Sequence, residues 1–258
     1  MKVFLRRHRL IAFFALAFVL SWYPWILALI RGHASGPNPL GPLVAAIIVT
    51  AIAYGRSGLR EFFNRLVRWR VGFKWYAVTF GTPVLFCLIA VAITRCFAPP
   101  AFVLSIDKIR ELPERFIFIL LFIGLGEEPG WRGFALPQLQ GRYSPLIASL
   151  ILGAFWAVWH FPLIGSEFAM PIIAPFVLSL FGATFTLTWL FNGTKGSVLL
   201  PMLLHATVNT IGAGLIFPLF SGAPLILLWW IYGVIWLCAG FGILLFSRNR
   251  IVEPVSAS

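Results

Sequence analysis

Six polar side chains interrupt otherwise apolar sequence and are of types that can do chemistry. They are Glu127, Glu128, Arg132, His160, His205 and Asn209. The first three come soon after the apolar run 116–123. An ionisable group inside a bilayer costs about 3 kcal/mol or more, so such groups mark a functional site or a tight internal pair.

The spacing of the three charged residues separates their roles. Glu128 and Arg132 are four residues apart and share one helix face, so an ion pair between them would offset the desolvation of both. Glu127 is rotated from Glu128 by about 100°, so we predict that it faces a cavity. Pro129 lacks an amide N–H and is expected to kink the helix there. The alternative is that both glutamates lie in a wet loop at a helix end.

Two histidines on other apolar segments could join this site. His160 precedes Phe161-Pro162, and His205 shares a helix face with Asn209, four residues later. A lone histidine in a membrane more often bridges helices by hydrogen bonds. Glu127, His160 and His205, however, lie roughly 18, 21 and 12 Å from the inner ends of their segments, at about 1.5 Å per residue. These depths are similar enough for one shared site.

Two chemistries fit this set of side chains. Glu127, His160 and His205 could bind zinc, since two imidazoles and a carboxylate are a known zinc set. Without a metal, Glu127 and His160 would take a proton from water, while His205 and Asn209 would donate hydrogen bonds to an oxyanion. The sequence has no His-Glu-x-x-His stretch, so the zinc interpretation lacks its strongest sign. We therefore expect no cofactor, with zinc as the alternative.

Composition assigns the chain to the membrane proteins. Of its 258 residues, 60% are apolar and only 11% are charged, which excludes a soluble globular protein. The three cysteines are odd in number and lack metal-site spacing, so they suggest neither a disulfide framework nor a Cys-based zinc site. A net charge of +12 could indicate nucleic-acid binding, but basic cytoplasmic loops explain it better. No nucleic-acid partner is expected.

The apolar segments predict an all-α polytopic membrane protein of about eight transmembrane helices around an intramembrane catalytic cavity. One domain, 1–258, accounts for the chain. The first segment is too long for a signal-peptide core, so it is expected to remain uncleaved. Between the second and third segments, 56–74 mixes basic and apolar residues as in an amphipathic helix on an anionic inner leaflet. The predicted spans are 10–30, 40–54, 75–94, 116–139, 146–163, 171–191, 197–217 and 225–246.

Charge distribution predicts the orientation of these spans. The side that carries both termini holds 14 of the 20 Lys and Arg residues, including the basic start 2–9, the segment 56–74 and the tail with Arg248 and Arg250. The opposite side holds five. Because Lys and Arg are enriched on cytoplasmic loops, we expect both termini in the cytoplasm and the protein in the cell membrane.

Three motifs together resemble a known family, the CAAX prenyl protease and bacteriocin-processing enzymes, also called the CPBP, Abi or type II CAAX endopeptidase family. Its motifs are Glu-Glu-x-x-x-Arg, an aromatic residue four before a His, and His-x-x-x-Asn. This chain has them in that order as Glu127-Glu128-x-x-x-Arg132, Trp156-x-x-x-His160 and His205-x-x-x-Asn209. The protease-like core is 116–217.

The resemblance implies an intramembrane endopeptidase whose cavity opens toward the cytoplasm. It implies that Glu127 and His160 activate water, that His205 and Asn209 hold the oxyanion, and that Glu128 and Arg132 support the site. The family is often labelled metalloprotease, although a metal-free glutamate mechanism is also argued for it; we favour the metal-free chemistry. The expected substrate is a membrane-anchored or membrane-associated peptide or protein, and bacteriocin maturation, self-immunity or surface-protein anchoring are the roles it suggests.

Two other functions compete with the peptidase. A non-catalytic scaffold or bacteriocin-immunity factor of the same fold would have little need for Glu127 and both histidines together. A proton-coupled transporter could use a buried Glu and His as a relay, and it would tolerate loss of Asn209.

Overall fold

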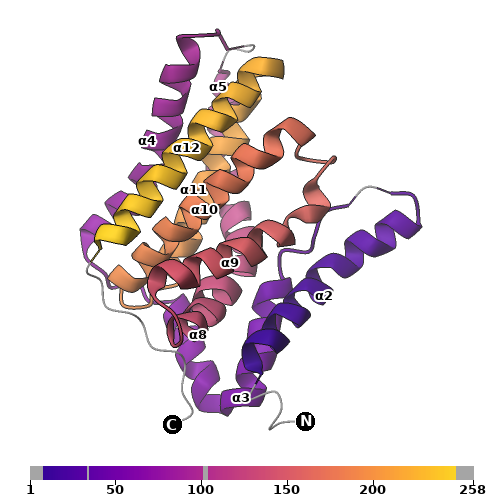
Figure 1. The fold of residues 1–258 in the computed structure, drawn as a ribbon, viewed down its shortest axis with the longest axis vertical. Coiled ribbons are helices and arrows are strands. Elements are labelled where there is room, and N and C mark those ends of the chain that lie inside the picture. Colours follow the sequence, from indigo (N-terminus) through magenta and orange to yellow (C-terminus); the bar gives the residue numbers. More distant parts are fainter. Residues whose placement is uncertain (1–7, 34, 101–103, 248–258) are drawn as a thin grey trace.

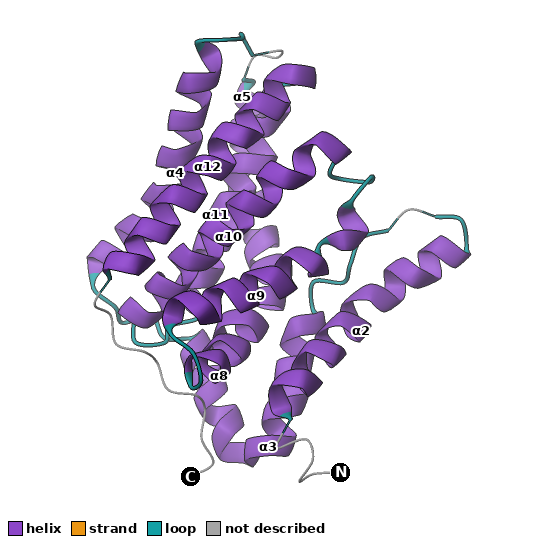
Figure 2. Cartoon of the chain, in the orientation of Figure 1, coloured by secondary structure: helices purple, strands orange, loops and turns teal. Residues whose placement is uncertain are grey.

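The computed structural model describes residues 8–33, 35–100 and 104–247, and within these ranges all regular elements are helical (Figure 2). The predicted basic start (Lys2, Arg6 and Arg7) and the tail residues Arg248 and Arg250 lie outside the described residues. The α-helices are α2 (Arg9–Ile30), α3 (Gly41–Leu66), α4 (Phe73–Arg95), α5 (Ile106–Arg110), α6 (Leu112–Phe118), α7 (Leu125–Glu128), α8 (Leu136–Gln140), α9 (Pro145–Trp159), α10 (Met170–Gly193), α11 (Leu199–Ile211) and α12 (Gly222–Phe246).

Seven helices in the described part are long and apolar enough to cross a membrane, which confirms an all-α polytopic membrane protein. They are α2, α3, α4, Pro145–Leu163, α10, Leu199–Leu219 and α12. Two of them include short extensions: α9 continues into the 3₁₀-helix η3 (Phe161–Leu163), and α11 continues into η4 (Gly212–Ile216), which is π-helical, and the 3₁₀-helix η5 (Phe217–Leu219).

The predicted span 116–139 is not one of these seven helices, because its path is divided among five short elements. From α6 it passes through the π-helix η1 (Ile119–Gly124), α7, the π-helix η2 (Pro129–Ala135) and α8. Pro129 begins η2, and it has no N–H for the α-helical hydrogen bond. Single π-turns inside helices are often found at functional sites, and here they flank Glu127 and Glu128.

The segments 40–54 and 56–74 differ from the prediction. They are joined in α3, which is kinked at Gly55, where φ is +67°, a conformation open to glycine because it has no Cβ. The helix then ends at Leu66 instead of continuing to 74. Two carbonyl groups, one in its last turn and one just beyond its end, have partners outside the helix, since Val198 N–H donates to Arg65 O and Ser197 Oγ donates to Arg68 O, at 2.9 and 2.7 Å.

The bundle has two ends that carry different connections (Figure 1). We call the end where α2 begins and α12 ends the base; it also holds the connections 67–72, 141–144 and 194–198. The opposite end, which we call the top, holds α5 and the connections 35–40, 160–169 and 212–221. Most long helices run between base and top, whereas α3 begins inside the bundle and bends along the base (Figure 1). Loops from distant parts of the sequence therefore meet at the same end.

Helices α10 and α12 approach each other closely through two glycines. A Cβ on Gly182 would lie 2.1 Å from the backbone carbon of Trp236, and a Cβ on Gly240 would lie 2.2 Å from the carbonyl oxygen of Gly182. Small residues allow transmembrane helices to pack with their backbones in contact. Both helices contribute cavity-lining side chains, so this contact helps to position the site.

Gly182→Ala is expected to separate α10 from α12 and to lower thermal stability, because overpacking a tight contact typically costs about 1–3 kcal/mol. The measurement is the unfolding temperature of the detergent-purified protein. Gly242→Ala on α12 is the matched control: a Cβ there meets no atom within 4 Å, so its unfolding temperature should match the wild type. Equal unfolding temperatures for the two variants would contradict the packing role of Gly182.

Candidate active site

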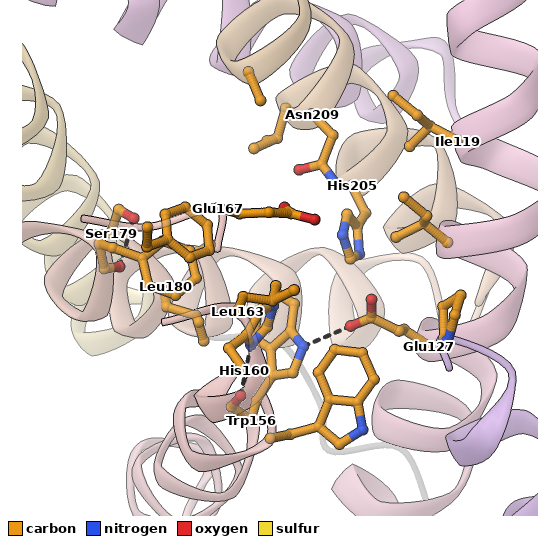
Figure 3. A pocket seen from close by; sticks show the side chains of 18 of the residues that line it. Ile119, Glu127, Trp156, His160, Leu163, Glu167, Ser179, Leu180, His205 and Asn209 are labelled. Carbon is orange, nitrogen blue, oxygen red and sulfur yellow. Dashed lines mark hydrogen bonds between the residues drawn. The ribbon is translucent and has the colours of Figure 1, made fainter. Parts of the chain in front are cut away.

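A cavity of about 400 Å³ lies between the α6–α7 path and helices α9, α10, α11 and α12. Four of the six predicted site residues line it: Glu127, His160, His205 and Asn209 (Figure 3). The other two, Glu128 and Arg132, are fully buried beside it. The structure therefore brings all six residues to one place from three segments of the chain.

Glu127 is held at the cavity wall by two indole groups. Trp156 Nε1 donates to Glu127 Oε2 at 2.7 Å, and Trp131 Nε1 donates to the same oxygen at 3.4 Å. Only 3% of Glu127 is exposed. Because both indoles bind Oε2, the second carboxylate oxygen, Oε1, is left for a ligand in the cavity. The expectation that Glu127 faces a cavity is confirmed.

Glu128 forms the predicted ion pair and one further contact. Arg132 Nη1 lies 3.0 Å from Glu128 Oε1, and both side chains are 0% exposed. His205 Nδ1 lies 2.8 Å from the same oxygen. Arg132 is held further by Thr184 Oγ1 at 3.4 Å. Glu128 thus connects α7 to α11 and orients the His205 ring toward the cavity.

The hydrogen bonds of the two histidines decide which ring nitrogens remain available. His160 Nδ1 lies 2.7 Å from the carbonyl oxygen of Trp156. A carbonyl only accepts, so His160 Nδ1 carries the proton and a neutral ring presents the lone pair of Nε2. His205 Nδ1 donates to the Glu128 carboxylate in the same way. Its Nε2 carries a proton only when the ring is an imidazolium.

From the sequence, Trp156 was predicted only as the aromatic residue of a motif. It donates to Glu127 and accepts from His160, and its ring lies under the Arg132 guanidinium, with the Arg132 Cζ 4.2 Å from the ring centroid. Its ring also meets His205 edge to face, at 5.6 Å between centroids. The sequence did contain a sign of these contacts. Trp156 is four residues from His160, and Trp131 is four residues from Glu127, so the members of each pair share a helix face.

Comparison with known proteins shows what the segment that carries these residues is similar to. The family profile described as "Type II CAAX prenyl endopeptidase Rce1-like" matches residues 111–211, which include all six site residues. A curated protein named "CAAX prenyl protease 2" from Methanococcus maripaludis is 28% identical over 191 residues, covering 67% of this chain and 69% of that protein. Over this segment the chain is similar to the type II CAAX prenyl endopeptidases. This family is one of proteases, so it supports an intramembrane endopeptidase for which the cavity is the candidate active site.

The side chains around the cavity include types that bind metals, namely histidine and glutamate. Within the described ranges, no three His, Cys, Asp or Glu side chains are arranged to hold one metal ion. Each histidine gives Nδ1 to a protein acceptor, which leaves its Nε2 for the cavity, and Glu127 Oε2 receives two indoles, which leaves Oε1. As they lie in this structure, Glu127, His160 and His205 are not grouped around one point, and zinc stays the alternative that metal analysis of the purified protein decides.

Proposed function

We propose that this protein is an intramembrane endopeptidase that hydrolyses a peptide bond with water activated by Glu127 and His160. The observation that carries the proposal is a buried carboxylate with one free oxygen, in the same cavity as an imidazole whose Nε2 is free to accept a hydrogen bond. A water molecule between Glu127 Oε1 and His160 Nε2 would be oriented by both groups. This pairing is suited to general base catalysis.

The side chains of the cavity account for each proton transfer in the hydrolysis. Glu127 takes a proton from water as the water oxygen attacks the carbonyl carbon of the substrate. The carbonyl oxygen becomes an oxyanion that accepts hydrogen bonds from His205 and from the Asn209 amide. Collapse of the tetrahedral intermediate breaks the C–N bond, and the proton on Glu127 passes to the leaving amine. The products are a carboxylic acid and an amine.

The oxyanion role requires His205 to be an imidazolium, because its Nδ1 is already used by Glu128. A doubly protonated His205 would give two cations, Arg132 and His205, and two carboxylates, Glu127 and Glu128. The buried charges would then balance. Glu128 would bind both cations through Oε1, so it is a positioning residue that does not touch the substrate.

We propose a membrane-anchored or membrane-associated peptide or protein as the substrate, because the cavity lies among helices suited to cross a bilayer. The Methanococcus relative is named for prenylated CAAX proteins, and a lipid-modified chain end is one member of this substrate class. We also propose that the protein lies in the cell membrane with both termini in the cytoplasm, on the basis of the charge bias.

Incubation of the purified protein with a quenched library of membrane-tethered peptides tests the proposed reaction. We expect cleavage at an internal peptide bond, unaffected by chelators and without stoichiometric metal in the protein. Activity lost to a chelator and restored by zinc, with metal lost from His160→Ala, would instead make the histidines ligands. Peptide binding without cleavage of any library member would contradict the reaction and favour a non-catalytic scaffold.

Asn209→Ala is expected to lower kcat by about 10²- to 10³-fold with little change in KM, as loss of one oxyanion donor does. Asn209 lines the cavity on α11, one turn after His205. The measurement is steady-state cleavage of the best library peptide. A variant with unchanged kcat would remove Asn209 from the oxyanion site.

A further inference from the structure

The catalytic cavity opens at the top of the bundle. Every connection that lines it belongs to that end: Gly36, Pro37 and Pro39 after α2, Glu167 and Phe168 after α9, and Ala213 and Gly214 after α11. Arg115, near the start of α6, lines the cavity on the same side. None of the described base connections, 67–72, 141–144 and 194–198, contributes a lining residue.

The two ends differ in their numbers of basic and acidic residues. Among the described residues, the base and the adjoining part of α3 after Gly55 carry one acidic residue, Glu61, and the basic residues Arg9, Arg56, Arg60, Arg65, Arg68, Arg70, Lys74, Arg142 and Lys195. At the top, five basic residues stand with four acidic ones: Arg31, Arg95, Lys108, Arg110 and Arg115 with Asp107, Glu111, Glu114 and Glu167. Since Lys and Arg are enriched on the cytoplasmic side, this distribution favours the base as the cytoplasmic end.

These two observations exclude one of the sequence expectations. Cytoplasmic termini and a cavity that opens toward the cytoplasm cannot both hold, because α2 begins and α12 ends at the base while the cavity opens at the top (Figure 1). The charge distribution belongs to this chain itself, whereas the cytoplasmic opening was implied by resemblance alone.

We propose that the cavity receives its substrate from the outer face of the membrane. The substrate class is then a peptide segment displayed on that face, for example next to a lipid anchor in the outer leaflet or after export. The orientation stands independently of the chemistry, but the statement that this peptide is cleaved rests on the proposed function.

The entrance of the cavity suits a peptide that arrives from water. Arg115 and Glu167 both line it and both are exposed, and in Figure 3 Glu167 extends into the cavity from the connection after α9. Gly214 leaves room for the Arg115 stem: a Cβ there would lie 2.6 Å from Arg115 Cδ. An opening flanked by a cation and a carboxylate stays hydrated and can bind the polar backbone or charged ends of a peptide.

Labelling of single cysteines in intact cells tests the orientation. Cys96 is an exposed native thiol at the top end of α4, Cys87 is buried, and Cys238 lies within α12. In a Cys238→Ser background, we expect a membrane-impermeant maleimide to label Cys96 in intact cells. Tyr143→Cys, placed at the exposed base connection in a Cys96→Ser, Cys238→Ser background, should be labelled only after permeabilisation.

The opposite pattern, or equal labelling of the two sites in intact cells, would overturn the proposal. Should Cys96 prove unreactive even in permeabilised cells, Asp107→Cys provides a second top probe, because the Asp107 side chain is 78% exposed. Asp107→Cys labelled only after permeabilisation would likewise overturn the proposal.

Membrane vesicles of known orientation test from which face the substrate enters the cavity. A membrane-impermeant peptide that the detergent-solubilised protein cleaves should be cleaved by right-side-out vesicles and not by inverted ones. Cleavage by inverted vesicles alone, or by neither preparation, would overturn entry from the outer face. Failure of cleavage in detergent would instead count against the proposed reaction and would leave the labelling result as the test of orientation.

Discussion

Glu127→Gln is expected to lower kcat by about 10²- to 10⁴-fold, the range that general base catalysis contributes. Glutamine has nearly the same size, and its amide oxygen can still accept the indole N–H of Trp156, so the local packing is retained. It cannot take a proton from water. The measurement is kcat for cleavage of a membrane-tethered peptide, together with the unfolding temperature, which should stay close to that of the wild type.

Glu114→Gln is the matched control for this loss. Glu114 lies on α6, on the same helical path as Glu127, but it is exposed and does not line the cavity. The same chemical change at this position should leave kcat near the wild-type value. If Glu127→Gln kept full activity, the assignment of Glu127 as the base would be wrong, whatever the family resemblance implies.

Four-residue spacing was the most reliable sequence signal for the site. It predicted the Glu128–Arg132 ion pair, which forms at 3.0 Å, because residues four apart in a helix lie on one face. The same rule relates Trp156 to His160 and Glu127 to Trp131, whose contacts are local in sequence. Local spacing works because helix geometry alone brings such side chains together.

Contacts between helices could not be predicted from spacing. Glu128 and His205 are 77 positions apart in sequence, and their hydrogen bond depends on how α7 and α11 pack. The end of α3 at Leu66 is another case, since the backbone there accepts hydrogen bonds from Ser197 and Val198. The segment 56–74 has an amphipathic pattern throughout, and nothing within it indicates that distant loop.

The sequence also did not predict that 116–139 is divided into five elements. Pro129 predicted a kink, whereas the structure has π-helical segments on both sides of Leu125–Glu128. A π-turn inserts one residue and rotates the side chains that follow it. The face presented by Trp131 and Arg132 is therefore set by the backbone around Pro129 as well as by the number of residues from Glu127.

Arg132→Ala is expected to destabilise the protein strongly, because it leaves Glu128 buried without its main partner. Removing one member of a buried ion pair costs about 3–5 kcal/mol, and the stacking of the guanidinium on Trp156 is lost as well. The unfolding temperature and the yield of folded protein should both fall.

Arg110→Ala is the matched control for Arg132→Ala, because its pair with Asp107 is 3.5 Å long and largely exposed, and such pairs contribute little. The double variant Glu128→Gln, Arg132→Met should recover part of the stability, since it removes both buried charges together. If Arg132→Ala and Arg110→Ala unfolded at the same temperature, the buried pair would contribute no more than a surface pair. The support of His205 by Glu128 would then have to come from the 2.8 Å hydrogen bond alone.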